Sequence, residues 1–168
     1  MDINTKLDNK WNLWYHYSKN DWSIHGYKNL FTIETIKDFW DLTNSWEDNG
    51  GIHQNEYFLM KENVQPIWED INNENGGCWS YKKKEEKSQQ LWDDLASYLV
   101  SGNLSKDLNL INGLSISKKK NGWIVIKIWN NDINKSSLKY INYDILKKWG
   151  LDLIYIAHPK TKKKVILK

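Results

Sequence analysis

Short runs of apolar and aromatic residues, separated by polar turns, recur along the whole chain. These runs are rich in β-branched and aromatic residues, and they have the length of single strands rather than of membrane-spanning segments. The pattern predicts about eight strands, at residues 10–18, 27–33, 56–61, 78–83, 113–119, 123–130, 153–156 and 165–167. Because neighbouring strands are joined by turns, we expect them to pair in an antiparallel sheet.

Apolar residues at helical spacing predict three helices between these strands, at residues 35–46, 88–101 and 138–149. Thr35 followed by Asp38 has the form of a capping box at the start of the first helix. The predicted fold class is therefore α+β, with helices covering one face of an antiparallel sheet and the other face free to bind a ligand.

The chain has 168 residues, which is the size of one domain. Residues 1–9 are polar, and we expect them to form a flexible N-terminal segment before a single domain over residues 10–168.

Alternation in the last predicted hairpin separates the two faces of the sheet. Three isoleucines, expected to face the helices, lie on one side: Ile124, Ile126 and Ile128. The open side carries Trp123, Val125, Lys127 and Trp129. Indole rings on an uncovered face gain no packing to offset their poor hydration, so this pattern favours a ligand site on the open face.

Composition sharpens this picture in two ways. The chain has 11 Trp although its Lys-, Asn- and Ile-rich composition is typical of AT-rich coding DNA, as in a protist or a large DNA virus. Core packing or stacking on a flat ligand would explain these indoles. All 24 basic residues are Lys, so phosphate contacts depend on ammonium groups, hydroxyls or backbone amides rather than on guanidinium groups.

Several functional classes are excluded by the remaining residues. The net charge of +3 is too small for a broad nucleic-acid-binding field. Cys78 is the single cysteine, and no group of Cys and His has metal-ligand spacing, so we expect no disulfide, metal or cofactor. The four His lie apart without a nucleophile pattern, which predicts that the protein is not an enzyme.

Five segments with an ordered spacing run from about residue 10 to residue 158. They are KWNLWY at 10–15, ETIKDFW at 34–40, VQPIWED at 64–70, GGCW at 76–79 and IKIWN at 126–130. Together these segments resemble the eukaryotic translation initiation factor 4E family of messenger-RNA cap-binding proteins. The resemblance implies a curved antiparallel sheet with three helices on its convex face and a cap slot on its concave face.

The resemblance also assigns the residues of that slot by position. Trp22 and Trp68 would sandwich the 7-methylguanine base, with Tyr27 as the alternative to Trp22. The methylated base carries a delocalised positive charge, which two indole faces attract. Glu69 would accept two hydrogen bonds from a guanine edge that adenine does not offer. Trp129 would touch the N7-methyl group.

Phosphate recognition departs from the family pattern. Cys78 stands where the family usually has a basic residue, so the lysines of the late hairpin and of the tail are the candidates: Lys119, Lys120, Lys127, Lys160 and Lys162. Trp123, on the same open face, is a candidate to stack on the next nucleotide.

Family members also bind partner proteins on the convex face. Ile36 and Trp40 match the pair that docks a helical segment of an initiation factor 4G-like scaffold, and Asp94 is placed to pair with a basic residue of that partner. Asp93 stands where an apolar contact is usual, so partner use is expected to differ.

The sequence therefore predicts a monomeric cap reader in the cytoplasm, of the host if the source is viral, that recruits capped mRNA for translation initiation and binds no membrane. Within the same fold, the alternative is a translational repressor or decoy that sequesters capped messages. In a different class, the alternative is a carbohydrate- or single-strand RNA-binding module built on Trp platforms.

Overall fold

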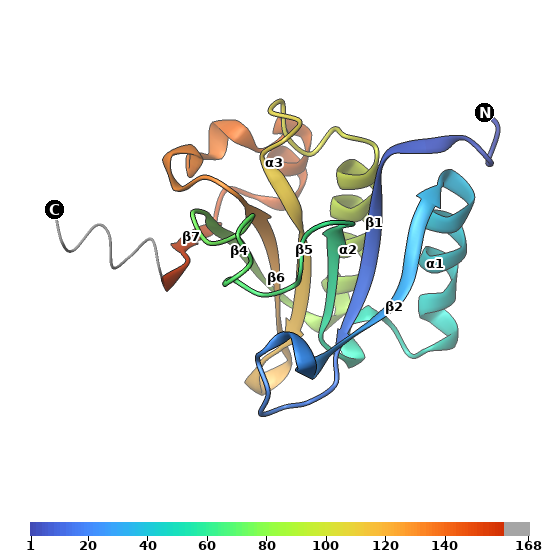
Figure 1. The fold of residues 1–168 in the computed structure, drawn as a ribbon, viewed down its shortest axis with the longest axis horizontal. Coiled ribbons are helices and arrows are strands. Elements are labelled where there is room, and N and C mark those ends of the chain that lie inside the picture. Colours follow the sequence, from blue (N-terminus) through green and yellow to red (C-terminus); the bar gives the residue numbers. More distant parts are fainter. Residues whose placement is uncertain (160–168) are drawn as a thin grey trace, which may run out of the picture.

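The computed structural model describes residues 1–159, which form one antiparallel sheet of seven strands with three α-helices (Figure 1). The strands are β1 Lys6–His16, β2 Tyr27–Thr35, β3 Tyr57–Lys61, β4 Gly77–Lys84, β5 Ile111–Lys118, β6 Trp123–Asn130 and β7 Ile154–Ala157. The helices are α1 Ile36–Asp48, α2 Glu85–Val100 and α3 Tyr143–Trp149. The strands lie in the order β2-β1-β3-β5-β6-β4-β7. The α+β class predicted from the sequence is confirmed.

Several boundaries differ from the predicted ones, most of all the starts of β1 and α3. β1 begins at Lys6, which pairs with Thr35 of β2, rather than at the predicted residue 10. α3 starts only after Asn142, whose side chain caps it, because residues 138–140 form a separate 3₁₀ turn. The strand expected at residues 165–167 lies outside the described residues.

The main core lies between the sheet and the helices. The three isoleucines of β6 face it as predicted, since none of Ile124, Ile126 and Ile128 is more than 1% exposed. Leu91 and Leu95 of α2 are fully buried in the same cluster. Removal of this apolar surface from water is the main force that holds α2 against the sheet.

Helix α1 begins with the predicted capping box. The amide of Asp38 donates to Thr35 Oγ1 at 3.1 Å, and the amide of Thr35 donates to Asp38 Oδ2 at 2.9 Å. The helix buries Phe39 and Trp46 but leaves Trp40 half exposed. None of the helices within residues 1–159 is long and apolar enough to cross a membrane.

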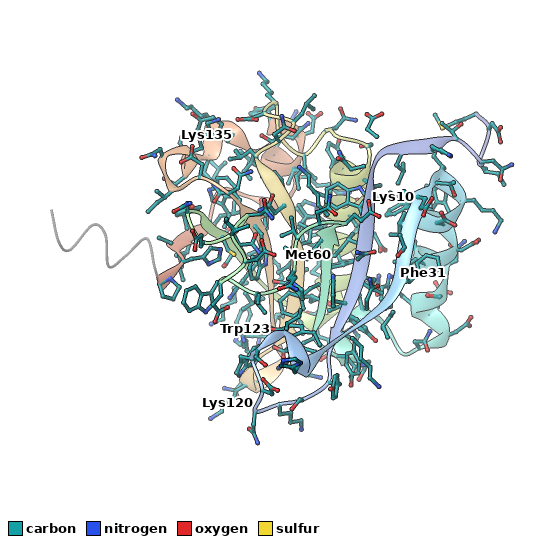
Figure 2. All side chains as sticks on the ribbon, viewed as in Figure 1. Lys10, Phe31, Met60, Lys120, Trp123 and Lys135 are labelled. Carbon is teal, nitrogen blue, oxygen red and sulfur yellow. The ribbon has the colours of Figure 1, made fainter. Side chains whose placement is uncertain are left out.

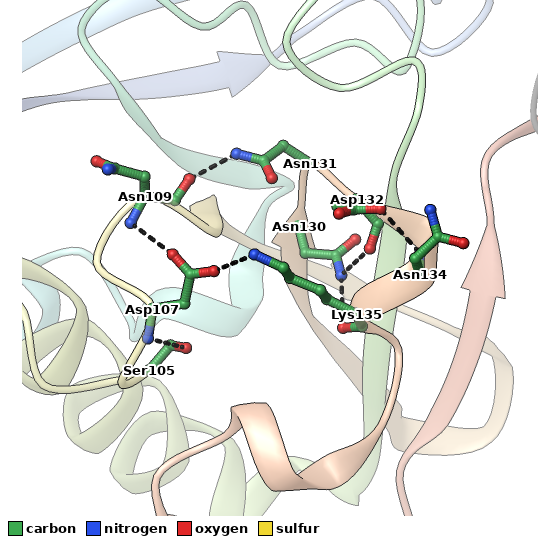
Figure 3. A network of polar contacts seen from close by, with 8 residues as sticks. All are labelled: Ser105, Asp107, Asn109, Asn130, Asn131, Asp132, Asn134 and Lys135. Carbon is green, nitrogen blue, oxygen red and sulfur yellow. Dashed lines mark hydrogen bonds and ion pairs between the residues drawn. The ribbon is translucent and has the colours of Figure 1, made fainter.

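Close backbone contacts explain the two glycines before β4. A Cβ atom on Gly76 would lie 1.9 Å from the carbonyl oxygen of Asn130, and one on Gly77 would lie 2.4 Å from the carbonyl oxygen of Ile156. The side chain of Asn130 is fully buried; its Oδ1 accepts from the Gly77 amide, and its Nδ2 donates to the backbone of Lys135. The surrounding polar network therefore fixes the ends of β4 and β6 (Figure 3).

The open face of the sheet carries a second, smaller apolar cluster. Its buried members are Tyr27, Phe58, Met60, Val64, Cys78 and Trp129. Met60 lies near the middle of the sheet in Figure 2. Because these side chains alternate with those of the main core along each strand, the sheet separates a large helix-side core from a small aromatic floor on its open face.

Candidate functional site

A pocket of about 240 Å³ lies above this aromatic floor. Its walls come from the loop after β1, the starts of β2 and β3, the loop between β3 and β4, and strands β5 and β6. Six residues predicted from the sequence line it: Trp22, Trp68, Glu69, Lys119, Lys127 and Trp129. Segments far apart in the sequence thus meet in one concave site, which is where ligand sites are usually found.

Trp22 is held against the pocket by a buried histidine. The indole is 54% exposed, and its ring stacks on His16 with 4.0 Å between centroids and 26° between planes. His16 Nε2 donates to the carbonyl oxygen of Asp21 at 2.9 Å, and Nδ1 lies 2.9 Å from Glu56 Oε2. Both ring nitrogens of His16 therefore have a partner, which fixes the orientation of the ring on which Trp22 stacks.

Sequence reasoning gave His16 no role, because a lone histidine in a strand carries no signal of what it stacks on. Tyr27, the alternative to Trp22, also contacts this histidine, with ring centroids 4.6 Å apart and planes tilted by 39°. It is buried and contacts Phe58 edge-on. Burial, together with the carboxylates of Glu56 and Glu69, raises the pKa of Tyr27, so the phenol stays neutral.

The opposite wall is the loop that carries Trp68 and Glu69, both exposed. The loop is braced from below by Asn73, which is fully buried. Asn73 Nδ2 donates to the carbonyl oxygens of Gln65 at 3.0 Å and Ile67 at 2.9 Å. Asn112 Nδ2 in turn donates to Asn73 Oδ1 at 2.9 Å.

These bonds fix the backbone on the N-terminal side of Trp68 before any ligand arrives. Asp70 adds to the brace, because its Oδ2 accepts from the amide of Gln65 at 3.0 Å. Sequence reasoning missed Asn73 and Asn112, since isolated asparagines in an Asn-rich chain do not stand out. A site whose backbone is fixed in advance loses less conformational freedom when a ligand binds.

Trp129 forms part of the floor of the pocket. Its Nε1 donates to Ser115 Oγ at 2.9 Å, and its ring lies between Phe58 and His158, with centroids 6.1 and 5.1 Å away. Burial, helped by the charge of Lys127, lowers the pKa of His158 to about 4, so this ring is neutral at pH 7. Trp129 is only 7% exposed, and a ligand reaches only a small part of it.

Two lysines supply the positive charge of the pocket. Lys119 and Lys127 line it, and within the described part of the chain neither forms an ion pair. Lys118 is different, because its Nζ lies 3.0 Å from Glu85 Oε2 on the helix side. Cys78 is buried and uncharged, since burial raises the pKa of its thiol to about 12.

The remaining predicted contacts are Lys120, Trp123, Lys160 and Lys162. Lys120 and Trp123 belong to the turn and strand beside it but do not line it. Lys160 and Lys162 lie outside the described residues.

A larger groove, of about 670 Å³, lies on the helix side. Ile36 and Trp40 line it, as the predicted partner surface requires. Asp94 does not line it: its Oδ2 accepts from Trp149 Nε1 at 2.8 Å and lies 2.7 Å from Lys148 Nζ. The carboxylate of Asp94 is therefore already paired within the chain.

A helix-backed antiparallel sheet whose open face holds a pocket of aromatic rings, one exposed acid and two lysines is an architecture suited to a flat, charged ligand. The chain belongs to a known family of this architecture. The sequence model described as "Eukaryotic initiation factor 4E" matches residues 6–165.

Curated relatives are similar over most of this chain. Eukaryotic translation initiation factor 4E-3 of Caenorhabditis elegans is 28% identical over 84% of this chain and 60% of its own length. The factor 4E homolog of Acanthamoeba polyphaga mimivirus is 30% identical over 68% of this chain and 51% of its own length. The chain thus spans between half and two thirds of the length of these two relatives.

Solved structures of the family share the fold. A complex of Ascaris suum eIF4E-3 with m7G cap has a TM-score of 0.77 and 25% identity, covering 93% of this chain and 92% of that one. A complex of C. elegans eIF4E-3 with the 4E-binding protein Mextli has a TM-score of 0.76 and 26% identity, covering 95% and 96%. The family resemblance seen in the sequence is confirmed.

Proposed function

We propose that this protein binds the 7-methylguanosine cap of mRNA in the open-face pocket and acts as a non-enzymatic factor in translation initiation. The observation that carries the proposal is the convergence of Trp22, Trp68, Glu69 and Trp129 on one cavity. The cap complex of a related structure supports it. We place the protein in the cytoplasm, because capped messages are translated there. We expect it to act as a monomer.

Base recognition follows from the two walls. Trp22 and Trp68 stack on either face of the methylated base, whose positive charge each electron-rich indole attracts, by about 2 kcal/mol or more once water is excluded. Unmethylated guanine lacks this charge, so stacking itself selects the cap. The N7-methyl group then faces the accessible edge of Trp129.

Guanine is read by the acid and backbone of the braced loop. The carboxylate of Glu69 accepts from the N1–H and the exocyclic amine of guanine, and the amide of Trp68 donates to the base carbonyl. Charge-assisted bonds of this kind are about twice as strong as neutral ones. Adenine offers neither the donor pair nor the carbonyl, so it leaves the acid unsatisfied and is rejected.

The triphosphate lies against Lys119 and Lys127, the two lysines of the pocket. We assign secondary, electrostatic contacts to Lys120, Lys160 and Lys162. On the helix side, Ile36 and Trp40 are proposed to receive the apolar residues of a scaffold helix. Asp94 contributes there only if the partner displaces Lys148.

The test is a fluorescence titration with 7-methyl-GTP, GTP and an oligosaccharide. We expect strong quenching by 7-methyl-GTP and binding by GTP that is weaker by at least about tenfold. Glu69→Gln should lose about tenfold in affinity for 7-methyl-GTP, whereas Glu62→Gln, which changes an exposed acid outside the pocket, should not. Equal binding of GTP would favour generic stacking, and binding of the oligosaccharide would favour a carbohydrate module.

A further inference from the structure

We propose that a second subsite, formed by Trp123, Lys82 and Lys84, binds the first nucleotides of the RNA chain beyond the cap. We call these three residues the β4–β6 patch. The proposal rests on the cap-binding function proposed above and extends it from the cap to the message.

Strand register places the patch on the same face as the pocket. Lys84 is paired with Trp123 and Lys82 with Val125, while Cys78 is paired with Trp129 in the floor of the pocket. Side chains two residues apart share a face, so the patch residues and Trp129 all lie on the open face. The intervening residues Trp79 and Tyr81 are buried in the helix-side core, which confirms this parity.

Spacing along β6 puts the patch in line with the phosphates. Lys127 lies two residues before Trp129 on β6, about 7 Å away along the strand, and Trp123 lies four residues before Lys127, about 13 Å from it. The backbone of Lys119, which lines the pocket, donates to the carbonyl oxygen of Trp123 at 2.7 Å. A chain that leaves the cap along the two pocket lysines therefore meets Trp123 next, at the end of the sheet labelled in Figure 2.

Charge and exposure suit a nucleotide. The ammonium groups of Lys84 and Lys82 lie 4.0 and 4.9 Å from the centroid of the Trp123 ring, and both side chains are exposed. Among residues 1–159 no carboxylate pairs with either, whereas Lys83 on the opposite face donates to the carbonyl oxygen of Trp149 at 3.0 Å. A phosphate would relieve the repulsion between the two ammonium groups, and the indole ring can stack on a base.

A protein partner fits this surface less well. Protein interfaces have a buried apolar centre with charged residues depleted, and the patch has one indole between two exposed ammonium groups. An acidic peptide is the remaining competitor, because it would satisfy the charges but would gain little from stacking on the ring.

The experiment compares 7-methyl-GTP with a capped RNA of about eight nucleotides, using the full chain. Lys82→Gln/Lys84→Gln should bind capped RNA about tenfold more weakly and bind 7-methyl-GTP within about twofold of the unchanged protein. Its log-log salt slope for RNA should fall by about 1.4, as expected for two lost contacts to a single strand. The matched control is Lys87→Gln/Lys147→Gln, which removes the same charge from exposed helix positions.

Stacking is tested with Trp123→Ala and Trp123→Phe. The alanine variant should lose about tenfold for capped RNA alone, and the phenylalanine variant should retain most of the binding. If the double lysine variant and Trp123→Ala both bind capped RNA as tightly as the control variant does, the subsite is refuted. Competition by a short poly-glutamate peptide as effective as that by uncapped RNA would refute the RNA assignment.

The two proposals fail differently. A protein that prefers 7-methyl-GTP over GTP but whose RNA affinity ignores the patch keeps its cap function and loses only this subsite. A protein without that preference loses both.

Discussion

The pocket on the open face and the groove on the helix side differ in what lines them. The groove is larger, at about 670 Å³ against about 240 Å³, and combines apolar side chains such as Ile36 and Trp40 with scattered polar ones. The pocket joins aromatic rings, an acid and two lysines from separate segments. The groove is thus suited to a helix of a partner, and the pocket to one small ligand of defined charge, so convergence of chemistry identifies the ligand site better than size.

The largest difference between the two sites should appear when one tryptophan of each is replaced by alanine. Trp68→Ala removes one stacking face and should weaken 7-methyl-GTP binding by about a hundredfold, or about 3 kcal/mol. Trp40→Ala removes an indole that is even more exposed, 50% against 36%, from the groove and should leave that affinity unchanged. A fluorescence titration measures both, and equal losses would show that the pocket is not the cap site.

The next effect concerns the brace below Trp68. Asn73→Ala leaves the carbonyls of Gln65 and Ile67 without their buried donor, so the free energy of unfolding should fall by about 2–3 kcal/mol. The variant should also bind 7-methyl-GTP more weakly at temperatures where it is fully folded, because the loop is no longer fixed. Urea unfolding and titration at 10 °C separate the two effects; unchanged affinity of the folded variant would mean that the brace serves stability alone.

Lowering the pH should reduce the stability of the folded protein through His158, on the pocket side of the sheet. Its pKa is lowered to about 4 by burial, against about 6.5 in an unfolded chain. Between pH 6.5 and 4 the unfolded chain takes up a proton that the folded chain does not, so stability should fall by about 3 kcal/mol as the pH drops through this window and level off below it. Urea unfolding of His158→Gln should lack this part of the pH dependence; identical curves would contradict the assignment.

The helix side should respond with the opposite sign, and least. Burial raises the pKa of Asp93 to about 6, although Gln89 donates to the carboxyl. The folded chain then takes up this proton first, so Asp93 opposes folding at pH 7 and less so as the pH falls toward 4. Since the carboxyl is only half-buried, Asp93→Asn should stabilise by about 1 kcal/mol at pH 7 without changing cap affinity. Lower stability of this variant in thermal unfolding at pH 7 would reverse the argument.

Much of this architecture is predictable from local pattern. Alternation along β6 assigned Ile126 to the core and Trp129 to the open face, because a strand has only two sides. The spaced motifs grouped Trp68 and Glu69 with Trp22 and Trp129, and all four line one pocket. Spacing could not reveal that Asp94 is already paired with Lys148, since this ion pair joins α2 to α3 across a distance set only by tertiary packing.

The supports of the site were missed for a related reason. His16 and Asn73 act through bonds to backbone carbonyl oxygens of nearby loop residues, and a residue type alone does not show which carbonyl its side chain will reach. The start of β1 was also placed too late, because Lys6 pairs with Thr35 of β2 although the residues that follow it are polar. Composition thus reports what a segment contains but not the strand that it joins.

The stack of Trp22 on His16 leaves the indole with a single vacant side. A ligand can stack on this ring from one side only, because His16 covers the other face. Despite its exposure, the ring is thus already oriented before any ligand binds, so this wall of the pocket loses little conformational entropy on binding.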